Sequence, residues 1–80
     1  MHELGVLTYA LRLVDKAAAE QHIERVKHVT LQVGEESGYL PVFLHKLFPV
    51  AADALPRLQG AELRLEAVPG RQLLVKDFGD

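Results

Sequence analysis

Residues 23–38 read IERVKHVTLQVGEESG and decide the fold, because an alternation of apolar and polar residues ends abruptly in a turn. One face of the expected strand carries Ile23, Val29, Leu31 and Val33, and the other carries Val26, His28, Thr30 and Gln32. A period of two with many β-branched residues predicts a β-strand over residues 23–33 with one buried face. The segment Gly34-Glu35-Glu36-Ser37-Gly38 predicts the turn that ends it.

An amphipathic helix is predicted on each side of this strand. The first covers Leu4–Glu20, where apolar residues recur at spacings of three and four. The second begins at Leu40-Pro41, because proline is tolerated in the first turn of a helix. Its expected buried positions are Val42, Leu44, Leu47, Phe48, Ala51 and Leu55. Pro49 is expected to kink or split this helix near Leu47, since proline removes a helical hydrogen bond.

Two short strands are predicted after Gly60, over residues 61–67 and 72–76. The turn Val68-Pro69-Gly70-Arg71 joins them, with proline and glycine suited to its central positions. The element order indicates an α/β (α+β) fold, in which two helices pack on one face of a small three-stranded mixed sheet. A strand–helix–strand crossover within such a sheet is right-handed and its neighbouring strands are parallel.

The register between the last two strands has two solutions. A plain two-residue loop pairs Leu65 with Leu74. A β-bulge instead aligns Leu73 with Leu65. It also aligns Val75 with Leu63, and we favour it because apolar residues then lie opposite apolar residues.

Length and composition limit the function classes. Eighty residues form one small domain, and 25 % charged residues with 49 % hydrophobic residues are typical of a globular protein. A net charge of −2 without a basic stripe argues against nucleic-acid binding. No apolar run is long enough for a membrane span or a secretion signal, so we expect a cytoplasmic protein without a membrane partner. No catalytic motif is present, so we expect no enzyme.

The N-terminal residues Met1, His2 and Glu3 are the candidate metal ligands. A free α-amine, the backbone nitrogen of His2 and its imidazole can close two adjacent chelate rings on one ion. Nitrogen donors in a plane suit Ni(II) or Cu(II). Glu3 can add its backbone nitrogen or its carboxylate. The alternative is a chain terminus with an incidental histidine.

The remaining histidines and the acidic turn give weaker indications. His22, His28 and His45 each lack a second histidine at the spacing of three or four that builds a helical metal site. Glu35 and Glu36 are expected in a solvated turn, with metal relay or partner contact as the alternative. The chain has no cysteine, which excludes disulfides and cysteine-ligated zinc.

Three blocks of this sequence, in order, resemble the HypA/HybF family of metallochaperones. The first is Met1-His2-Glu3-Leu4, followed by the predicted helix. The second is residues 25–38, in which a strand ends in a Gly-Glu-x-Ser-Gly turn. The third is Gly60-Ala61-Glu62-Leu63 with Val68-Pro69, which resembles the strand that leads into the family's zinc domain. Residues 72–78 resemble the strand by which the chain returns from that domain.

The resemblance implies nickel delivery during maturation of [NiFe]-hydrogenase or urease. It implies Ni(II) as the bound ion, with Met1, His2 and Glu3 as ligands. It also implies two partners, the nickel-insertion GTPase and the hydrogenase large subunit. Family members carry a zinc domain with two Cys-x-x-Cys pairs between their last two strands. Here residues 68–71 join the strands directly, so we expect residues 1–80 to form a single nickel-binding domain without a zinc domain and without zinc.

A second hypothesis keeps the fold and changes the function. The chain would then be a protein–protein interaction module or paralogue without nickel delivery. Its third strand would pair with a second chain, giving a strand-swapped homodimer, because tight closure of the old insertion point strains the hinge.

Overall fold

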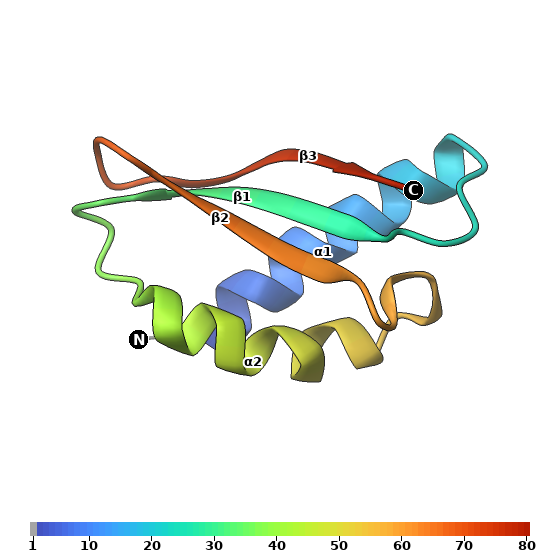
Figure 1. Cartoon of the computed structure of the whole chain (residues 1–80), viewed down its shortest axis with the longest axis horizontal. Helices are drawn as coiled ribbons and strands as arrows, with labels where there is room; N and C mark the ends of the chain where they lie inside the picture. Colours follow the sequence, from blue (N-terminus) through green and yellow to red (C-terminus); the bar gives the residue numbers. More distant parts are fainter. Residues whose placement is uncertain (1) are drawn as a thin grey trace.

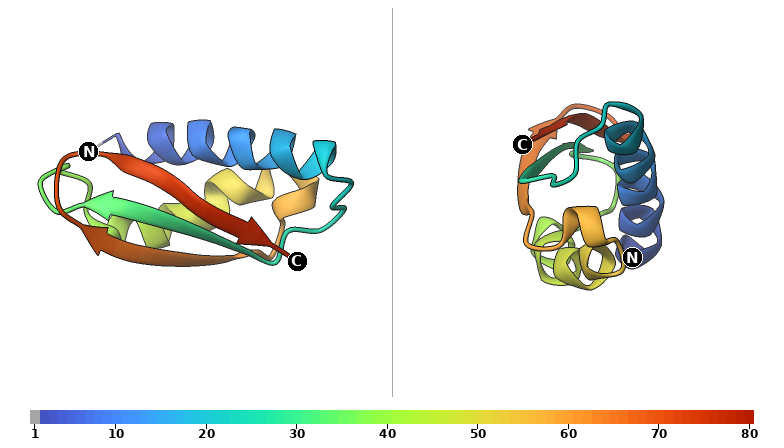
Figure 2. Two further views of the ribbon diagram at one scale, coloured as in Figure 1. Left: turned by 90° about the horizontal axis from the view of Figure 1, so that it is seen from above. Right: turned by 90° about the vertical axis from the view of Figure 1, so that its right-hand side faces the viewer.

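The computed structural model describes residues 2–80 and contains two α-helices, three strands and a short 3₁₀ helix (Figure 1). In chain order these are α1 (Glu3–Glu20), β1 (His28–Gly34), α2 (Pro41–Asp53), η1 (Pro56–Leu58), β2 (Glu62–Val68) and β3 (Leu73–Gly79). Both helices lie on the same side of the three-stranded sheet, as the end-on view in Figure 2 shows. The predicted mixed α+β architecture is therefore confirmed.

The sheet has the order β2-β1-β3, so the first strand lies in the centre. β1 pairs in parallel with β2 and antiparallel with β3. The parallel pairing follows from the crossover through α2, as expected for a strand–helix–strand unit. The predicted pairing between the last two strands is wrong, because β2 and β3 lie on opposite sides of β1. The chain crosses the end of β1 between them instead of folding back as a hairpin.

A register shift does occur, but in a different place from the one predicted. It lies in the β1–β3 pairing, where Thr30 faces Asp77 and Leu31 faces Val75. Lys76 is therefore an extra residue on β3, which is the arrangement of a β-bulge. The alternation of β3 side chains between the two faces of the sheet therefore shifts by one residue at Lys76.

The strand predicted over residues 23–33 begins only at His28. The segment before it is a loop held by contacts from elsewhere. The Ile23 N–H donates to Ala18 O at 2.9 Å and closes the end of α1. The Val26 N–H donates to Arg57 O at 2.9 Å, and the Val26 side chain is fully buried. The predicted strand was too long because apolar loop residues that pack in the core continue the alternating pattern of the strand.

The second helix runs without a break through Pro49, so the predicted split is wrong. Pro49 lies on the exposed side of α2, and Leu44 and Phe48 before it are buried. These contacts with the core hold the helix together across the missing hydrogen bond. Val42, expected in the buried stripe, is 66 % exposed, and Leu55 lies between α2 and η1 rather than in the helix.

The core forms between the sheet and the two helices. Its fully buried large side chains come from every layer: Leu7, Leu11, Leu31, Leu44, Leu58, Val14, Val26 and Val29. Thr30, on the other face of β1, is also 5 % exposed, because a central strand has neighbours on both edges. Within residues 2–80, no helix is long and apolar enough to cross a membrane.

Gly34 is the point at which the β2–β3 connection crosses β1. Its N–H donates to Gln72 O at 2.7 Å, and the next two N–H groups donate to Val68 O and Gly70 O, both at 2.8 Å. A Cβ atom on Gly34 would collide with the backbone carbonyl of Gly70. Because that obstacle is backbone rather than a flexible side chain, any larger residue displaces the crossing segment.

We expect Gly34→Ala to lower the free energy of unfolding by about 2–4 kcal/mol, because overpacking forces the backbone to shift. Chemical denaturation followed by circular dichroism measures the change. Gly5→Ala is the matched control, since no atom lies within 4 Å of the added Cβ. Alanine in α1 should leave stability unchanged or raise it by up to ~1 kcal/mol. Equal midpoints for Gly34→Ala and the parent chain would contradict the crossing argument.

Candidate functional site at the N-terminal ends of the two helices

His2 immediately precedes α1 and is exposed to solvent. Its backbone is in the left-handed region, with φ 60° and ψ 20°, and its carbonyl accepts the first helical hydrogen bond from Val6 N–H at 3.1 Å. The first N–H groups of a helix have no partner within the helix. The imidazole of His2 is therefore accessible beside backbone nitrogens at the positive end of α1.

Glu3 takes a different position from His2, because its side chain is buried at 5 % exposure. Its carboxylate accepts a hydrogen bond from the backbone N–H of Leu40 at 3.2 Å. Leu40 is the residue that precedes α2, so this bond joins the N-terminal ends of the two helices. The carboxylate thus has a structural partner within the fold.

The same contacts shift the ionisation of Glu3. The pKa of Glu3 is lowered from its ordinary 4.5, chiefly by a hydrogen bond with the terminal amino group. Burial acts in the opposite direction, and backbone hydrogen bonds from Leu40 and from Glu3 itself lower the pKa further. Glu3 is therefore an anion at neutral pH, as expected for a carboxylate that accepts several hydrogen bonds.

The three predicted ligands thus fall into different surroundings. Met1 lies outside the described residues, His2 is accessible, and Glu3 is buried against the start of α2. Within residues 2–80, no three His, Cys, Asp or Glu side chains gather closely enough to hold a metal ion. A metal site at this end of the molecule would therefore need main-chain nitrogen atoms beside the imidazole.

The other candidate residues have surroundings of their own. His22 and His45 are exposed, and His28 lies 3.5 Å from Asp77 on the sheet. The backbone N–H groups of Glu35 and Glu36 hold the crossing segment, while their side chains face solvent. The acidic turn therefore has a structural role in its main chain.

The face of the sheet opposite the helices carries a polar network. Lys76 Nζ lies 2.8 Å from a carboxylate oxygen of Glu66, and Gln32 Nε2 donates to the same carboxyl group at 3.4 Å. The hydrogen bond from Lys76, and then that from Gln32, lowers the pKa of Glu66. The Glu66 carboxylate in turn raises the pKa of Lys76. Lys76 and Glu66 therefore form an ion pair at neutral pH.

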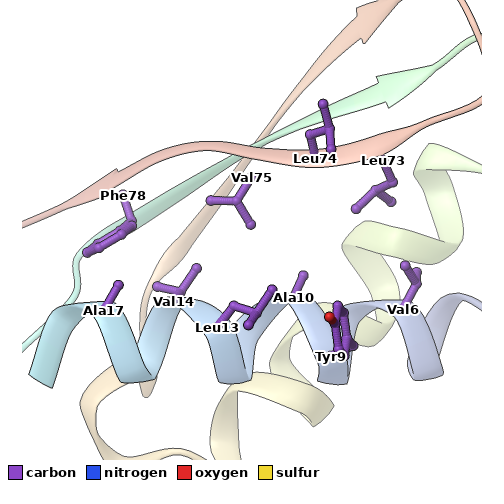
Figure 3. Close-up of a pocket in the computed structure, with 10 residues that line it drawn as sticks. All are labelled: Val6, Tyr9, Ala10, Leu13, Val14, Ala17, Leu73, Leu74, Val75 and Phe78. Atoms are coloured by element: carbon purple, nitrogen blue, oxygen red, sulfur yellow. The ribbon is translucent and has the colours of Figure 1, made fainter. Parts of the chain in front are cut away.

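An apolar groove of about 490 Å³ lies between α1 and β3 and was not predicted from the sequence (Figure 3). Its lining is Val6, Tyr9, Ala10, Leu13, Val14, Ala17, Leu73, Leu74, Val75 and Phe78. One indication of this groove was present in the sequence, because Tyr9 and Leu13 are apolar residues beside the buried stripe of α1. The other wall of the groove depends on β3 lying next to α1, which the assumed hairpin did not place there.

Comparison with known proteins identifies the family. Residues 1–73 match the family described as hydrogenase/urease nickel incorporation, metallochaperone, hypA. The chain belongs to the HypA family. Because that family consists of metallochaperones, the prediction that the chain is not an enzyme is confirmed at the level of the family.

Curated relatives carry the same family name. The chain is 38 % identical over 69 residues to the hydrogenase maturation factor HypA of Chloroflexus aurantiacus, covering 86 % of this chain and 60 % of the relative. It is 40 % identical over 72 residues to HypA of Streptomyces avermitilis, covering 89 % of this chain and 54 % of the relative. The chain thus matches little more than half the length of these HypA proteins.

The fold is also that of a solved HypA structure. The solution structure of the nickel metallochaperone HypA from Helicobacter pylori superposes with a TM-score of 0.78 at 15 % sequence identity. The superposition covers 96 % of this chain and 72 % of that protein. The few residues left outside the superposition are fewer than the residues of β3, so the superposition includes at least part of that strand. The likeness in fold therefore extends beyond residues 1–73, which the family match covers.

Glu3→Gln tests the role of the buried carboxylate. Because the folded state lowers the pKa of Glu3, the ionised carboxylate stabilises the fold at neutral pH. This contribution is lost as the pH falls from 4.5 through the folded-state pKa. We expect the variant to melt at a lower temperature than the parent at pH 7, and the difference in Tm to shrink below pH 4.5.

Thermal unfolding followed by circular dichroism between pH 3 and pH 7 measures both trends. The exposed Glu24 supplies the matched control, since Glu24→Gln removes a charge without a buried hydrogen bond. A difference in Tm that stays constant over the whole pH range would show that the charge of Glu3 does not stabilise the fold.

Proposed function

We propose that this chain is the nickel-binding domain of a HypA-type metallochaperone and takes part in nickel incorporation during hydrogenase maturation. Membership of the HypA family supports this role, and the names of the curated relatives favour hydrogenase as the client. The observation that carries the proposal is the exposed imidazole of His2 at the start of α1. Nickel is the cargo that this site would hold and release.

The proposed ligands are Met1, His2 and Glu3. Met1 contributes its α-amine, and His2 contributes its imidazole and its deprotonated backbone nitrogen. Main-chain nitrogen and imidazole are donors that suit square-planar Ni(II). A deprotonated amide carries negative charge, and the helix dipole of α1 favours negative charge at its N-terminal end. The position of His2 beside the helix therefore suits this mode of binding.

Glu3 completes the site through its backbone nitrogen rather than its carboxylate. The carboxylate is buried and accepts the hydrogen bond from Leu40 N–H. Moving it to a metal ion would expose it and break the contact between the two helices. In the proposed arrangement the side chain holds the N-terminal segment against α2, and the backbone nitrogen binds the ion after losing the proton that it donates to the Glu3 carboxylate.

Partner recognition is proposed at the level of the family. A nickel-insertion GTPase would act together with this chain before nickel reaches the hydrogenase large subunit. The chain contains no cysteine that could build a zinc site of the Cys-x-x-Cys type, and residues 69–72 join β2 to β3. We therefore assign residues 1–80 to a single nickel-binding domain without a zinc domain inserted between β2 and β3, and we propose that the surfaces of this domain take part in target recognition.

A second candidate function is protein–protein docking without nickel delivery. The apolar groove between α1 and β3 favours it, because exposed apolar surfaces mark interaction sites. In the described structure β3 pairs with β1 of the same chain. Binding of nickel to the isolated chain separates the two functions.

Titration of the untagged chain with Ni(II) tests the first function. We expect binding of one ion with the weak visible absorption of a planar nitrogen-rich site. His2→Ala removes the imidazole and should weaken binding by more than the ~10–100-fold typical of residues that only support a ligand. His45→Ala, which removes another exposed histidine, should leave binding unchanged. Equal affinity of His2→Ala and the parent chain would rule out this site.

Extension of the chain tests the contribution of the α-amine separately. One glycine placed before Met1 converts that amine to an amide and moves the free amine one residue away from His2. We expect the absorption of the planar site to disappear or shift, while the folded circular dichroism spectrum is retained. An unchanged nickel spectrum in the extended chain would show that the amine of Met1 is not a ligand.

A further inference from the structure

The outer edge of β3 has no strand beside it in the described part of the chain. β3 is an edge strand, paired with β1 on one side only. In the left-hand view of Figure 2, which looks down on this edge, β3 lies in front of the other elements. An open edge presents backbone N–H and C=O groups that can pair with another strand.

The apolar groove lies directly beside this open edge, between β3 and α1 (Figure 3). Two large side chains that line it on α1 are strongly exposed, with Tyr9 at 67 % and Leu13 at 49 %. A strand added to β3 would continue the sheet over the groove. Its inward side chains would then cover apolar surface that the single chain leaves in water.

The residues of β3 divide into two sets around the bulge. Leu73, Val75 and Phe78 pack against the core on the helix side. Lys76 and Asp77 both lie on the other side of the sheet, where they contact Glu66 and His28. Two consecutive residues share that side because Lys76 is the extra residue of the bulge.

We propose that two copies of this chain associate by antiparallel pairing of their β3 edges, with Lys76 of each copy opposite Asp77 of the other. Opposite residues in antiparallel strands lie on the same face of a sheet. This register places Val75 opposite Phe78 of the second copy, both on the helix side. It also places Leu74 opposite Gly79, both on the outer side.

Charge and packing favour the same register. The two-fold axis lies at the bulge, so the pair of Lys76 with Asp77 of the second copy occurs twice. Opposite charges on facing strands stabilise pairing, and like charges destabilise it. A charged residue and a bulge commonly prevent edge strands from pairing. In this chain the charged residues and the bulge disfavour most registers. They allow the proposed register, because each Lys76 then faces an Asp77 of the second copy.

This association differs from the exchange of β3 between chains. Each β3 keeps its pairing with β1 of its own chain and adds a second pairing on its free edge. The joined sheet has six strands, and the dimer requires no unfolding to form. None of the proposed contact pairs includes Met1, His2 or Glu3, so formation of the dimer does not depend on nickel.

The test uses two charge reversals, Lys76→Glu and Asp77→Lys, in the full chain. Each variant alone places like charges opposite each other twice, so we expect the dissociation constant of its dimer to rise by roughly tenfold or more. Mixing the two variants in equal amounts restores both ion pairs, because the acidic side chains at positions 76 and 77 of one variant then face lysines of the other. Sedimentation equilibrium should therefore show monomers of 8.9 kDa for each variant and dimers for the mixture.

The mixture also controls for folding, because a variant that cannot fold cannot form the heterodimer. Unfolding of each variant followed by circular dichroism gives an independent check. A parent chain that stays monomeric up to about millimolar concentration would overturn the proposal. A dimer that persists in both charge-reversal variants would overturn the proposal in favour of another surface. A dimer that exchanges subunits only as slowly as the chain unfolds would overturn it in favour of strand exchange.

Discussion

The structure depends on the pairing of β1 along both of its edges. The parallel partner β2 and the antiparallel partner β3 come later in the chain and must lie on opposite sides of β1. The connection between them therefore has to cross β1, and it does so at Gly34, where a side chain would meet the backbone of Gly70. The placement of β3 beside α1, the apolar groove and the open sheet edge all follow from this crossing.

A second contact determines the arrangement at the N-terminal ends of the helices. The carboxylate of Glu3 joins the starts of α1 and α2 through Leu40 N–H, and it leaves the imidazole of His2 in solvent. A metallochaperone must release its metal as well as bind it. Main-chain nitrogen and one imidazole at an accessible chain end suit that requirement better than a buried cage of side chains, and residues 2–80 contain no such cage. The fold thus holds the N-terminal segment in place without enclosing it.

An 80-residue chain cannot bury all of its apolar surface, because small domains bury a smaller fraction of the surface of their unfolded chains than large ones. In this molecule the exposed apolar side chains form more than one patch. Tyr9 and Leu13 lie along the groove beside β3, whereas Leu40, Val42 and Phe43 are exposed at the start of α2. Apolar surface available to a partner therefore lies both beside β3 and at the end of the molecule where the two helices begin.

The sequence by itself determined the two amphipathic helices, the end of β1 at Gly34, the mixed sheet and the position of His2 beside a helix start. Each of these depends on local periodicity, on glycine and proline, or on the order of the elements. Only the tertiary structure decided that β3 lies on the far side of β1, that Val26 fills the core from a loop, that α2 continues through Pro49 and that Glu3 is buried against Leu40. These features depend on contacts between residues that are distant in the chain. A strand has the same local pattern of apolar and polar residues whichever edge of β1 it pairs with, so the pattern cannot tell which edge it takes.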